Sequence, residues 1–338
     1  MEQASLTTAF VRVDDSSRVA ECRRVAIQMA RREGLSEQQS ANAAIVASEL
    51  ATNLAKYAQG GALQIATLSE RWRSGVELMA LDRGPGMASV SACMADGFST
   101  GASAGSGLGA VRRLSNYFDI HSIPGRGTVV VSQIYGDGAS PLPAFRLGIT
   151  TRAVAGEPVC GDTWGVRHAG RWTMLMVADG LGHGVLASEA ATAALSAFHR
   201  SKDESTVGVA KAMHGALRGT RGAAIAVARV EFEAGVVQFT GLGNIAGVVI
   251  SQEGTHNMIS HYGTAGHEAP HVREFQYPWT KNSVIVMHSD GVSGSWNPDA
   301  YPGFSRMHEA LISALLYRDC GRDRDDACVI VGRETESE

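Results

Sequence analysis

Two groups of polar residues, one in each half of the chain, have the types and spacing that phosphate chemistry requires. In the first half, Glu49 and Asn53 stand four residues apart in an alanine-rich segment, so both would project from one face of a helix. Asp82 follows an apolar run and is followed by Gly84 and Gly86. A carboxylate can act as a general base, and glycines let backbone amides approach phosphate. These residues indicate a nucleotide site.

A second glycine group stands before a predicted helix at 108–118. Gly105, Gly107 and Gly109 would bring backbone amides to the N-terminus of this helix, where the helix dipole favours negative charge.

Acidic residues in the second half recur beside glycine or beside another acid, at the ends of predicted strands. They are Asp162, Asp179, Asp290, Asp325 and Asp326. Any one of them alone is typical of a turn. Several carboxylates that converge at strand ends suit hard, oxygen-seeking cations such as Mg²⁺ or Mn²⁺. The pattern therefore predicts a carboxylate metal site.

The expected elements divide the chain into two α+β domains around a run of turn-forming residues. We expect a domain at 1–135, a linker at 136–144 and a second domain at 145–338. The first domain is expected to hold helices up to 33, at 36–57 and at 108–118, and strands at 63–68, 76–81, 118–123 and 128–134. This order predicts a sheet with helices on one face.

Short apolar runs bounded by Gly, Asp or Asn dominate the second domain. Strands are expected at 173–178, 223–230, 236–240, 246–250, 283–288 and 327–331, and helices at 186–200, 205–217 and 305–317. Strand-rich sequence interrupted by helices predicts a layered α+β sandwich.

The charge balance, the cysteine spacing and the length of the apolar runs exclude several classes of protein. The 338 residues carry 30 Lys and Arg against 34 Asp and Glu, a formal charge of −4, so a basic nucleic-acid-binding face is not expected. The five cysteines form no C-x-x-C pair, which favours free thiols in a reducing compartment. No apolar run reaches the roughly 18 residues of a membrane span. We therefore expect a cytoplasmic protein without nucleic-acid or membrane partners.

Four ordered segments of the first half resemble the boxes of the GHKL ATPases, the superfamily of gyrase, heat-shock chaperone, histidine kinase and MutL ATPases. The segment Glu49-Leu50-Ala51-Thr52-Asn53 resembles the N box and Asp82-x-Gly84-x-Gly86 the first glycine box. Gly105-x-Gly107-Leu108-Gly109 resembles the second glycine box, and Gly125-x-Gly127-Thr128 the closing box. The resemblance is closer to the RsbW- and RsbT-type serine kinases and implies a GHKL (Bergerat) α/β sandwich over about 5–135.

The resemblance implies a role for each box. Asn53 would hold Mg²⁺, Asp82 would accept a hydrogen bond from the adenine amino group, and Gly84 and Gly86 would let the chain turn beneath the ring. Glu49 would be the general base that takes a proton from an attacking serine hydroxyl or water. The other ATP-binding positions implied are Gly105, Gly107, Leu108, Gly109 and Thr128. The resemblance also implies a mobile lid over the triphosphate at about 95–106, and because lysine and arginine are scarce there, the phosphate contacts would rest mainly on backbone amides.

The second half resembles the SpoIIE and RsbX branch of the type 2C metal-dependent protein serine/threonine phosphatases. The resemblance rests on the segments 161–162, 178–184, 241–244, 289–292 and 325–331, which occur in the family's order. It implies an α/β/β/α sandwich with two Mn²⁺ or Mg²⁺ ions, bridged by Asp179 with the Gly180 carbonyl as a further ligand. Asp162, Asp290 and Asp325 would complete the cage, and Asp326 is the less favoured acid of its pair. His183 would either protonate the leaving serine oxygen or be a solvated loop residue.

Together the resemblances imply a bifunctional partner-switching regulator. One domain would phosphorylate a serine on a STAS-domain antagonist protein, similar to RsbS, and the other would remove the phosphate, within a stressosome-like or sigma-factor circuit. Two alternatives stay open. In the first alternative, only the phosphatase domain is catalytically active and ATP is an allosteric ligand of the first domain. In the second, the first domain is an anti-sigma binding module.

Overall fold

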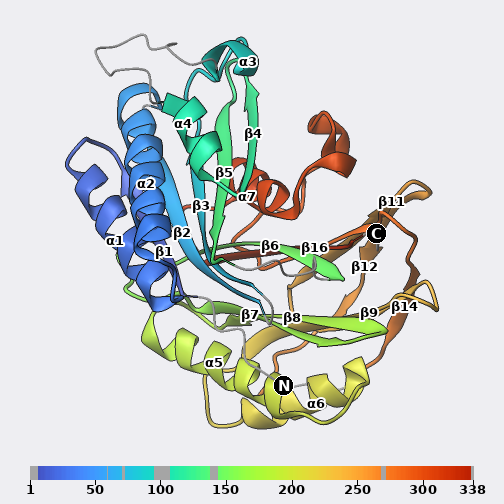
Figure 1. Cartoon of the computed structure of the whole chain (residues 1–338). Helices are drawn as coiled ribbons and strands as arrows, with labels where there is room; N and C mark the ends of the chain where they lie inside the picture. Colours follow the sequence, from blue (N-terminus) through green and yellow to red (C-terminus); the bar gives the residue numbers. More distant parts are fainter. Residues whose placement is uncertain are drawn as a thin grey trace. The chain divides into compact units, whose positions relative to one another are not determined.

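The computed structural model describes residues 7–58, 60–70, 73–94, 107–137, 144–267 and 272–335. The chain forms two compact units, Glu2–Pro141 and Leu142–Glu338 (Figure 1). Each unit has its own sheets and hydrophobic core and is described by itself. Among the described residues, no helix is both long enough and apolar enough to cross a membrane.

Two long helices of the N-terminal unit, α1 (Arg18–Arg32) and α2 (Glu37–Tyr57), pack against each other. Helix α2 begins with a capping box, in which the Ser36 hydroxyl accepts the Gln39 N–H and the Gln39 side chain accepts the Ser36 N–H. This reciprocal pair satisfies two N–H groups that would otherwise lack partners at the helix start. The apolar face of α2 is buried against the sheet.

Five antiparallel strands form the N-terminal sheet in the order β1-β2-β3-β5-β4. Their bounds are β1 Thr8–Val13, β2 Gly61–Glu70, β3 Arg73–Asp82, β4 Tyr117–Ile123 and β5 Gly127–Tyr135. Two shorter helices, α3 (Val90–Cys93) and α4 (Gly107–Leu114), precede β4. The helices and the sheet share one core, as the predicted sandwich requires.

Two stacked sheets form the C-terminal unit, and their strands pair antiparallel except for β13, which is parallel to β10. The first contains β7 Asp162–Ala169, β8 Trp172–Gly180, β9 Ala223–Glu231, β10 Val236–Leu242, β13 Ser260–His261 and β14 Phe275–Pro278. The second contains β6 Phe145–Arg152, β11 Ala246–Ser251, β12 Gly254–Met258, β15 Val284–His288 and β16 Ala327–Glu334. Buried side chains from both sheets, such as Val177 and Ile285, share one core between them.

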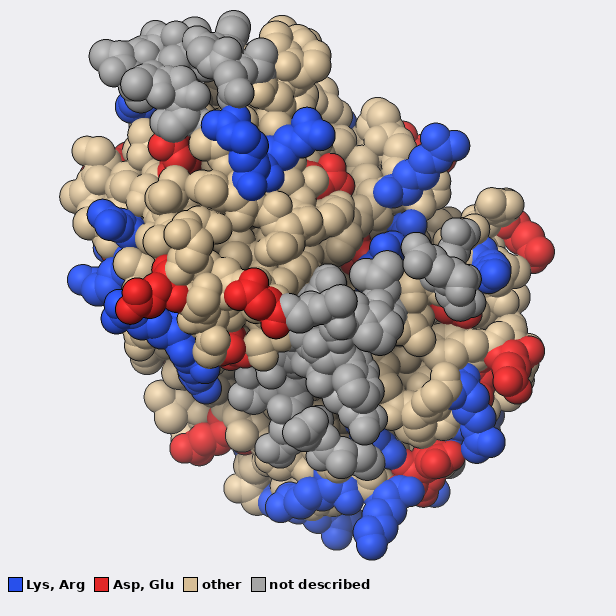
Figure 2. All heavy atoms as spheres, viewed as in Figure 1, with Lys and Arg blue, Asp and Glu red and all other residues tan. Residues whose placement is uncertain are grey.

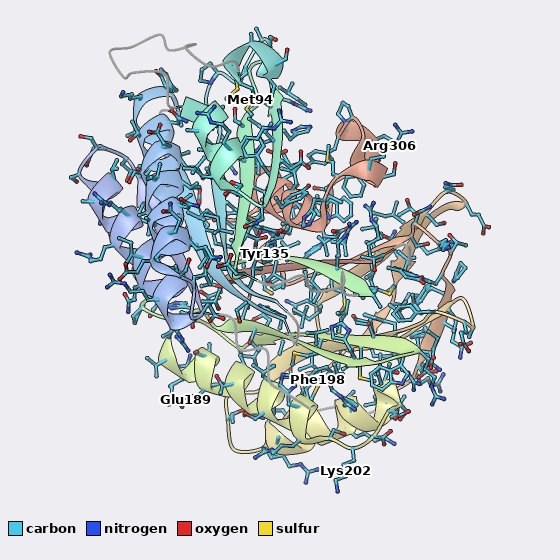
Figure 3. All side chains as sticks on the ribbon, viewed as in Figure 1. Met94, Tyr135, Glu189, Phe198, Lys202 and Arg306 are labelled. Atoms are coloured by element: carbon cyan, nitrogen blue, oxygen red, sulfur yellow. The ribbon has the colours of Figure 1, made fainter. Side chains whose placement is uncertain are left out.

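Helices cover the outer faces of these sheets. Helices α5 (Val185–Arg200) and α6 (Thr206–Ala216) pack on the first sheet, and α7 (Glu309–Cys320) packs on β6 and β16 of the second. Phe198 of α5 points into the core, whereas Glu189 points to solvent (Figure 3). This layering confirms the α/β/β/α sandwich that the sequence resemblance implies.

Several elements differ from the sequence prediction. Strands β1, β6 and β7 were not predicted, and α4 ends at Leu114 rather than near 118. Helix α4 stops early because the Asn116 N–H pairs with the Gln133 carbonyl and so leads the chain into β4. Helix α7 starts at Glu309, after two 3₁₀ turns at Pro298–Ala300 and Phe304–Arg306. On the face shown in Figure 2, basic and acidic side chains are interspersed.

Candidate functional site

Asp82 stands at the end of β3, where its side chain holds two segments of the N-terminal unit together. The Oδ1 atom accepts the Gly84 N–H at 2.8 Å and the Thr128 N–H at 3.2 Å. One carboxylate oxygen therefore fixes both the turn after β3 and the start of β5. Thr128 in turn hydrogen-bonds the Ser122 hydroxyl at 2.8 Å.

Glycine is required by the backbone at two of these positions. Gly86 has φ +67°, and a Cβ there would collide with the Ile123 carbonyl. Gly127 has φ +84°, and a Cβ there would collide with the Asp82 carbonyl. A residue with a side chain would push the turn after β3 away from the β4–β5 turn. The glycines thus position Asp82.

Helix α2 carries Glu49 and Asn53 at half-buried positions one turn apart. Helix α4, which packs against α2, begins at Gly107, buries Leu108 and contains Gly109 in its first turn. The structure therefore contains the elements that would carry the N box and the second glycine box. Gly105 and the predicted lid at 95–106 lie outside the described residues.

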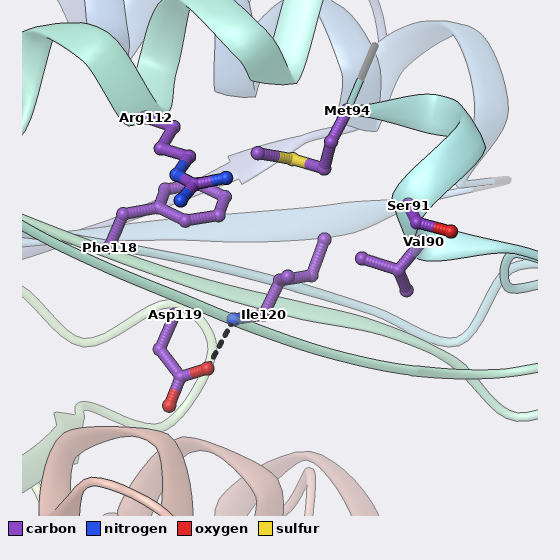
Figure 4. A pocket seen from close by; sticks show the side chains of 7 residues that line it. All are labelled: Val90, Ser91, Met94, Arg112, Phe118, Asp119 and Ile120. Atoms are coloured by element: carbon purple, nitrogen blue, oxygen red, sulfur yellow. Dashed lines mark hydrogen bonds between the residues drawn. The ribbon is translucent and has the colours of Figure 1, made fainter.

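A cavity of about 640 Å³ lies between α3, α4 and β4 (Figure 4). Its lining residues are Val90, Ser91, Met94, Arg112, Phe118, Asp119 and Ile120. The Asp119 carboxylate accepts the Ile120 N–H at 2.8 Å. None of the described residues that we predict to bind ATP is among the lining residues of this cavity.

In the C-terminal unit, Asp162 and Asp179 are directly opposite each other in the β7–β8 pairing. Directly paired residues of an antiparallel ladder project from the same face, so both carboxyl groups lie on one side of the sheet. The Gly180 N–H donates to the Gly161 carbonyl at 3.0 Å. A Cβ on Gly180 would collide with the Ala187 carbonyl of α5, so glycine lets the helix approach the strand end.

Two side chains that were not predicted as site residues hold these acids in place. The Ser289 hydroxyl donates to Asp162 Oδ2 at 2.5 Å and accepts the Cys328 N–H at 3.0 Å. The Asn244 side-chain amide donates to Asp290 Oδ2 at 2.6 Å. The segments that carry Asn244 and Ser289 were recognised in the sequence, but no spacing links either of them to its acid.

Asp325 and Asp326 differ in what their oxygens contact. Asp326 is buried, and its two oxygens accept the Val154 N–H at 2.7 Å and the Gly161 N–H at 2.9 Å. Asp325 is half-buried and accepts the Asp326 N–H at 3.0 Å. Asp326 therefore ties loops together, whereas the Asp325 carboxylate has greater access to solvent.

The chemistry of this donor set fits a divalent cation. Burial raises the pKa of Asp179, and the negative charges of Asp162 and Asp290 raise it further. Burial also raises the pKa of Asp162, although the hydrogen bond from Ser289 lowers it in part. The pKa of Asp325 is raised by burial and by the negative charge of Asp290. Among the described residues these acids do not form a ready-made cage of three or more ligands. They form an open cluster of mutually repelling carboxylates, which a cation would stabilise.

His183 follows this cluster in the loop between β8 and α5. Its Nδ1 lies 2.7 Å from Glu157 Oε1, and its side chain is 63% exposed. The ring therefore has a carboxylate partner and access to solvent. This arrangement leaves both predicted roles of His183, proton donor and solvated loop residue, available.

Comparison with known proteins agrees with the two folds. The histidine kinase-like ATPase domain family matches residues 13–133, and the stage II sporulation protein E (SpoIIE) family matches residues 169–333. Together with the geometry, these matches define a histidine kinase-like ATPase domain joined to a type 2C-like serine/threonine phosphatase domain.

Individual relatives identify the family more closely. The serine/threonine-protein kinase RsbT of Bacillus subtilis is 32% identical over 120 residues, which cover 36% of this chain and 90% of RsbT. The phosphoserine phosphatase RsbX of the same organism is 23% identical over 139 residues, 41% of this chain and 70% of RsbX. A solved structure from work on the bacterial stressosome is 33% identical, with a TM-score of 0.53, and covers 56% of this chain and 99% of its own. The chain therefore belongs to the RsbT family through its N-terminal domain, to which a SpoIIE-type phosphatase domain is joined.

Proposed function

We propose that this chain is a two-activity phosphorylation switch, which phosphorylates a serine of a STAS-domain partner protein and removes the same phosphate. The observation that carries the proposal is the presence, in one chain, of a kinase-like nucleotide fold and a carboxylate cluster on a phosphatase fold. Two opposing reactions on one partner would let the chain set the phosphorylation level of that partner. This is the logic of partner-switching regulation.

For the phosphatase reaction, Asp162, Asp179, Asp290 and Asp325 would hold two Mn²⁺ or Mg²⁺ ions, with the Gly180 carbonyl as a further ligand. Such ions supply an activated water and stabilise the charge of phosphoryl transfer. The hydrogen bonds from Ser289 to Asp162 and from Asn244 to Asp290 orient the carboxylates. Supporting groups of this kind fix the direction of metal ligands.

For the kinase reaction, the nucleotide would lie between α2 and the Asp82 turn. Asp82 is already oriented by the Gly84 and Thr128 N–H groups, and its other oxygen would accept the adenine amino group. Asn53 would hold Mg²⁺, and Glu49, one turn away on the same helix, would take the proton of the serine hydroxyl.

A protein substrate fits the surface around the carboxylate cluster. Four large apolar side chains are exposed within seven residues of Asp162 or Asp179, namely Val159, Leu181, Val185 and Leu186. Exposed apolar side chains close to a reaction site favour a protein partner over a small polar phosphate ester. The similarity to RsbT, to RsbX and to a stressosome-derived structure supports a STAS-domain protein as that partner.

The experiment follows partner phosphoserine over time with labelled ATP and Mg²⁺ or Mn²⁺. It compares the wild-type chain with E49A and D179A. We expect label to accumulate more strongly in D179A, because removal is blocked, and to vanish in E49A, because transfer is blocked. Circular dichroism of each variant checks that the fold is retained.

Other results would lead to different functions. If no variant labels the partner but the wild-type chain still strips pre-phosphorylated partner, the first domain is an ATP sensor and the two-activity proposal is wrong. If D179A strips the partner as fast as the wild-type chain does, the carboxylate assignment is wrong. A stable, nucleotide-dependent complex with a sigma factor that does not need Glu49 would support the anti-sigma alternative.

A further inference from the structure

The turn before β9 lies directly beside the carboxylate cluster. In the β8–β9 pairing, Asp179 is opposite Ala224 and Gly180 is opposite Ala223. The pairing continues past the strand end, where the Leu181 N–H donates to the Gly222 carbonyl at 3.0 Å. The residue just before Gly222, Arg221, is therefore held next to the loop that follows Asp179.

The Arg221 side chain extends over this loop. A Cβ built on Gly182 would lie 3.0 Å from Arg221 Nη1, so the absence of a side chain at Gly182 leaves room for the guanidinium. Gly182 also has φ +85°, which glycine adopts without strain. Within the described part of the chain, no carboxylate lies within salt-bridge distance of this guanidinium, and Arg221 is exposed.

The backbone on both sides of Arg221 is fixed. The Arg221 carbonyl lies 3.0 Å from His267 Nε2, and the Gly222 N–H donates to Thr220 Oγ1 at 3.0 Å. The Thr220 hydroxyl also donates to the Leu217 carbonyl at the end of α6. A charged side chain on an anchored turn loses less conformational freedom when it binds a ligand.

Two other basic side chains, Arg322 and His183, lie near the cluster. The backbone N–H of Arg322 donates to the Gly291 carbonyl at 2.7 Å. The positive charge of the Arg322 side chain lowers the pKa of Asp325, which burial and the Asp290 charge raise. His183 pairs with Glu157. Arg221 differs from both in position, because its guanidinium lies beside Gly182 in the loop that follows Asp179, where none of the described carboxylates pairs with it.

We propose that Arg221 is a substrate-binding residue, whose guanidinium holds the phosphate group of a phosphoserine side chain beside the carboxylate cluster. This inference rests on the phosphatase activity proposed above. A phosphate monoester carries close to two negative charges at neutral pH, so a guanidinium beside the cluster would attract it. A guanidinium offers two parallel N–H donors that match two phosphate oxygens. Helix α5 begins at Val185, three residues after Gly182, and its N-terminus adds a favourable dipole.

The test compares R221Q, R221K, R322Q and R200Q in the full chain. Arg200 is an exposed cation at the opposite end of α5, about 20 Å from the N-terminus of the helix, so R200Q removes the same charge far from the cluster. The substrate is a synthetic phosphoserine peptide with Mn²⁺. A second readout, which needs no turnover, is calorimetric binding of inorganic phosphate to the Mn²⁺-loaded protein.

We expect R221Q to raise KM for the peptide and Kd for phosphate by about 10- to 100-fold, with a smaller change in kcat. R221K should recover part of the lost affinity, because lysine keeps the positive charge but lacks the two parallel N–H donors of a guanidinium. R200Q should match the wild-type chain. Thermal unfolding of R221Q should match that of R200Q, since neither side chain is buried.

Three results would separate the possible failures. Unchanged KM and phosphate Kd in R221Q would overturn the Arg221 assignment and leave the phosphatase proposal intact. A larger rise of KM and Kd in R322Q than in R221Q would overturn it in favour of Arg322. If the wild-type chain hydrolyses no phosphoserine peptide but binds phosphate through Arg221, the anion site stands and the phosphatase proposal fails.

Discussion

At the residue scale, the neighbouring acids Asp325 and Asp326 have different roles, because their carboxylates have different hydrogen-bond partners and different access to solvent. Both oxygens of Asp326 accept backbone N–H groups from other loops, at Val154 and Gly161, whereas Asp325 bonds only the next residue in the described structure. A buried carboxylate that receives two N–H donors is a structural crosslink. The more accessible carboxylate is the better ligand for a cation.

This contrast gives a prediction for two matched variants. In D326N an amide NH₂ replaces one oxygen and faces a backbone N–H, so the free energy of unfolding should fall by about 1–3 kcal/mol. D325N should unfold like the wild-type chain but lose Mn²⁺-dependent hydrolysis of phosphoserine peptide. Urea unfolding and the peptide assay measure the two effects. A stable but inactive D326N, beside an active D325N, would reverse the assignment.

The residues that hold the acids were harder to predict than the acids themselves. Asp162 and Asp179 each stand beside glycine at a strand end, a pattern visible in the sequence. Ser289 hydrogen-bonds Asp162 although the two residues are 127 positions apart in the sequence. Arg221 lies next to Gly182 only because β9 pairs with β8. Contacts of this kind follow from sheet register, which no local spacing records.

At the element scale, local signals explain which parts of the fold were predictable. The capping box at Ser36 and Gln39 sets the start of α2 within the sequence itself, and that prediction is confirmed. The β4–β5 hairpin is likewise set by a local turn and was predicted. Strand β1 was missed because its partner β2 begins about 50 residues later and its exposed edge gives a weak apolar pattern.

The C-terminal end of α5 gives a pH prediction. His199 is half-buried beside Phe198, with ring centroids 5.2 Å apart, and Arg167 donates to the Phe198 carbonyl. Burial and the Arg167 charge lower the pKa of His199. The folded-state pKa thus lies below the unfolded value of about 6.5, so the unfolded chain takes up the proton first as pH falls.

The stabilisation linked to His199 should therefore be present above about pH 6.5 and be lost as pH falls through the lowered pKa. We expect the wild-type chain to lose more unfolding free energy between pH 7.5 and 5.5 than H199Q, which cannot titrate at this position. Urea titrations across this range measure the difference, and R200Q serves as a neighbouring control. Equal slopes for the wild-type chain and H199Q would contradict the prediction.

At the scale of the whole molecule, the carboxylate cluster unites both sheets of the C-terminal unit. Asp162 and Asp179 belong to one sheet, while Asp290 and Asp325 flank β15 and β16 of the other. Repulsion among these acids opposes the stacking of the sheet ends. A cation bound only by the folded state would offset that repulsion and stabilise the unit.

We therefore expect Mn²⁺ at about 100 times its Kd to stabilise the chain by about 2.7 kcal/mol, which corresponds to about 5–10 °C in the melting temperature of a unit of this size. D179N should show little shift with Mn²⁺. Its melting temperature without metal should equal or exceed that of the wild-type chain, because one repelling charge is gone. A full Mn²⁺ shift in D179N would exclude Asp179 as a ligand.

The long chain separations within the cluster also affect the order in which the protein becomes competent during synthesis. The last strand of the N-terminal unit ends at Tyr135. Asp162 and Gly161 can form their hydrogen bonds only after Ser289 and Asp326 have been synthesised, and β16 ends at Glu334. At about 5–20 residues per second, the ribosome needs roughly 10–40 s to add this remainder. In each newly made molecule, all strands of the N-terminal unit are therefore synthesised before the last residues that the carboxylate cluster needs.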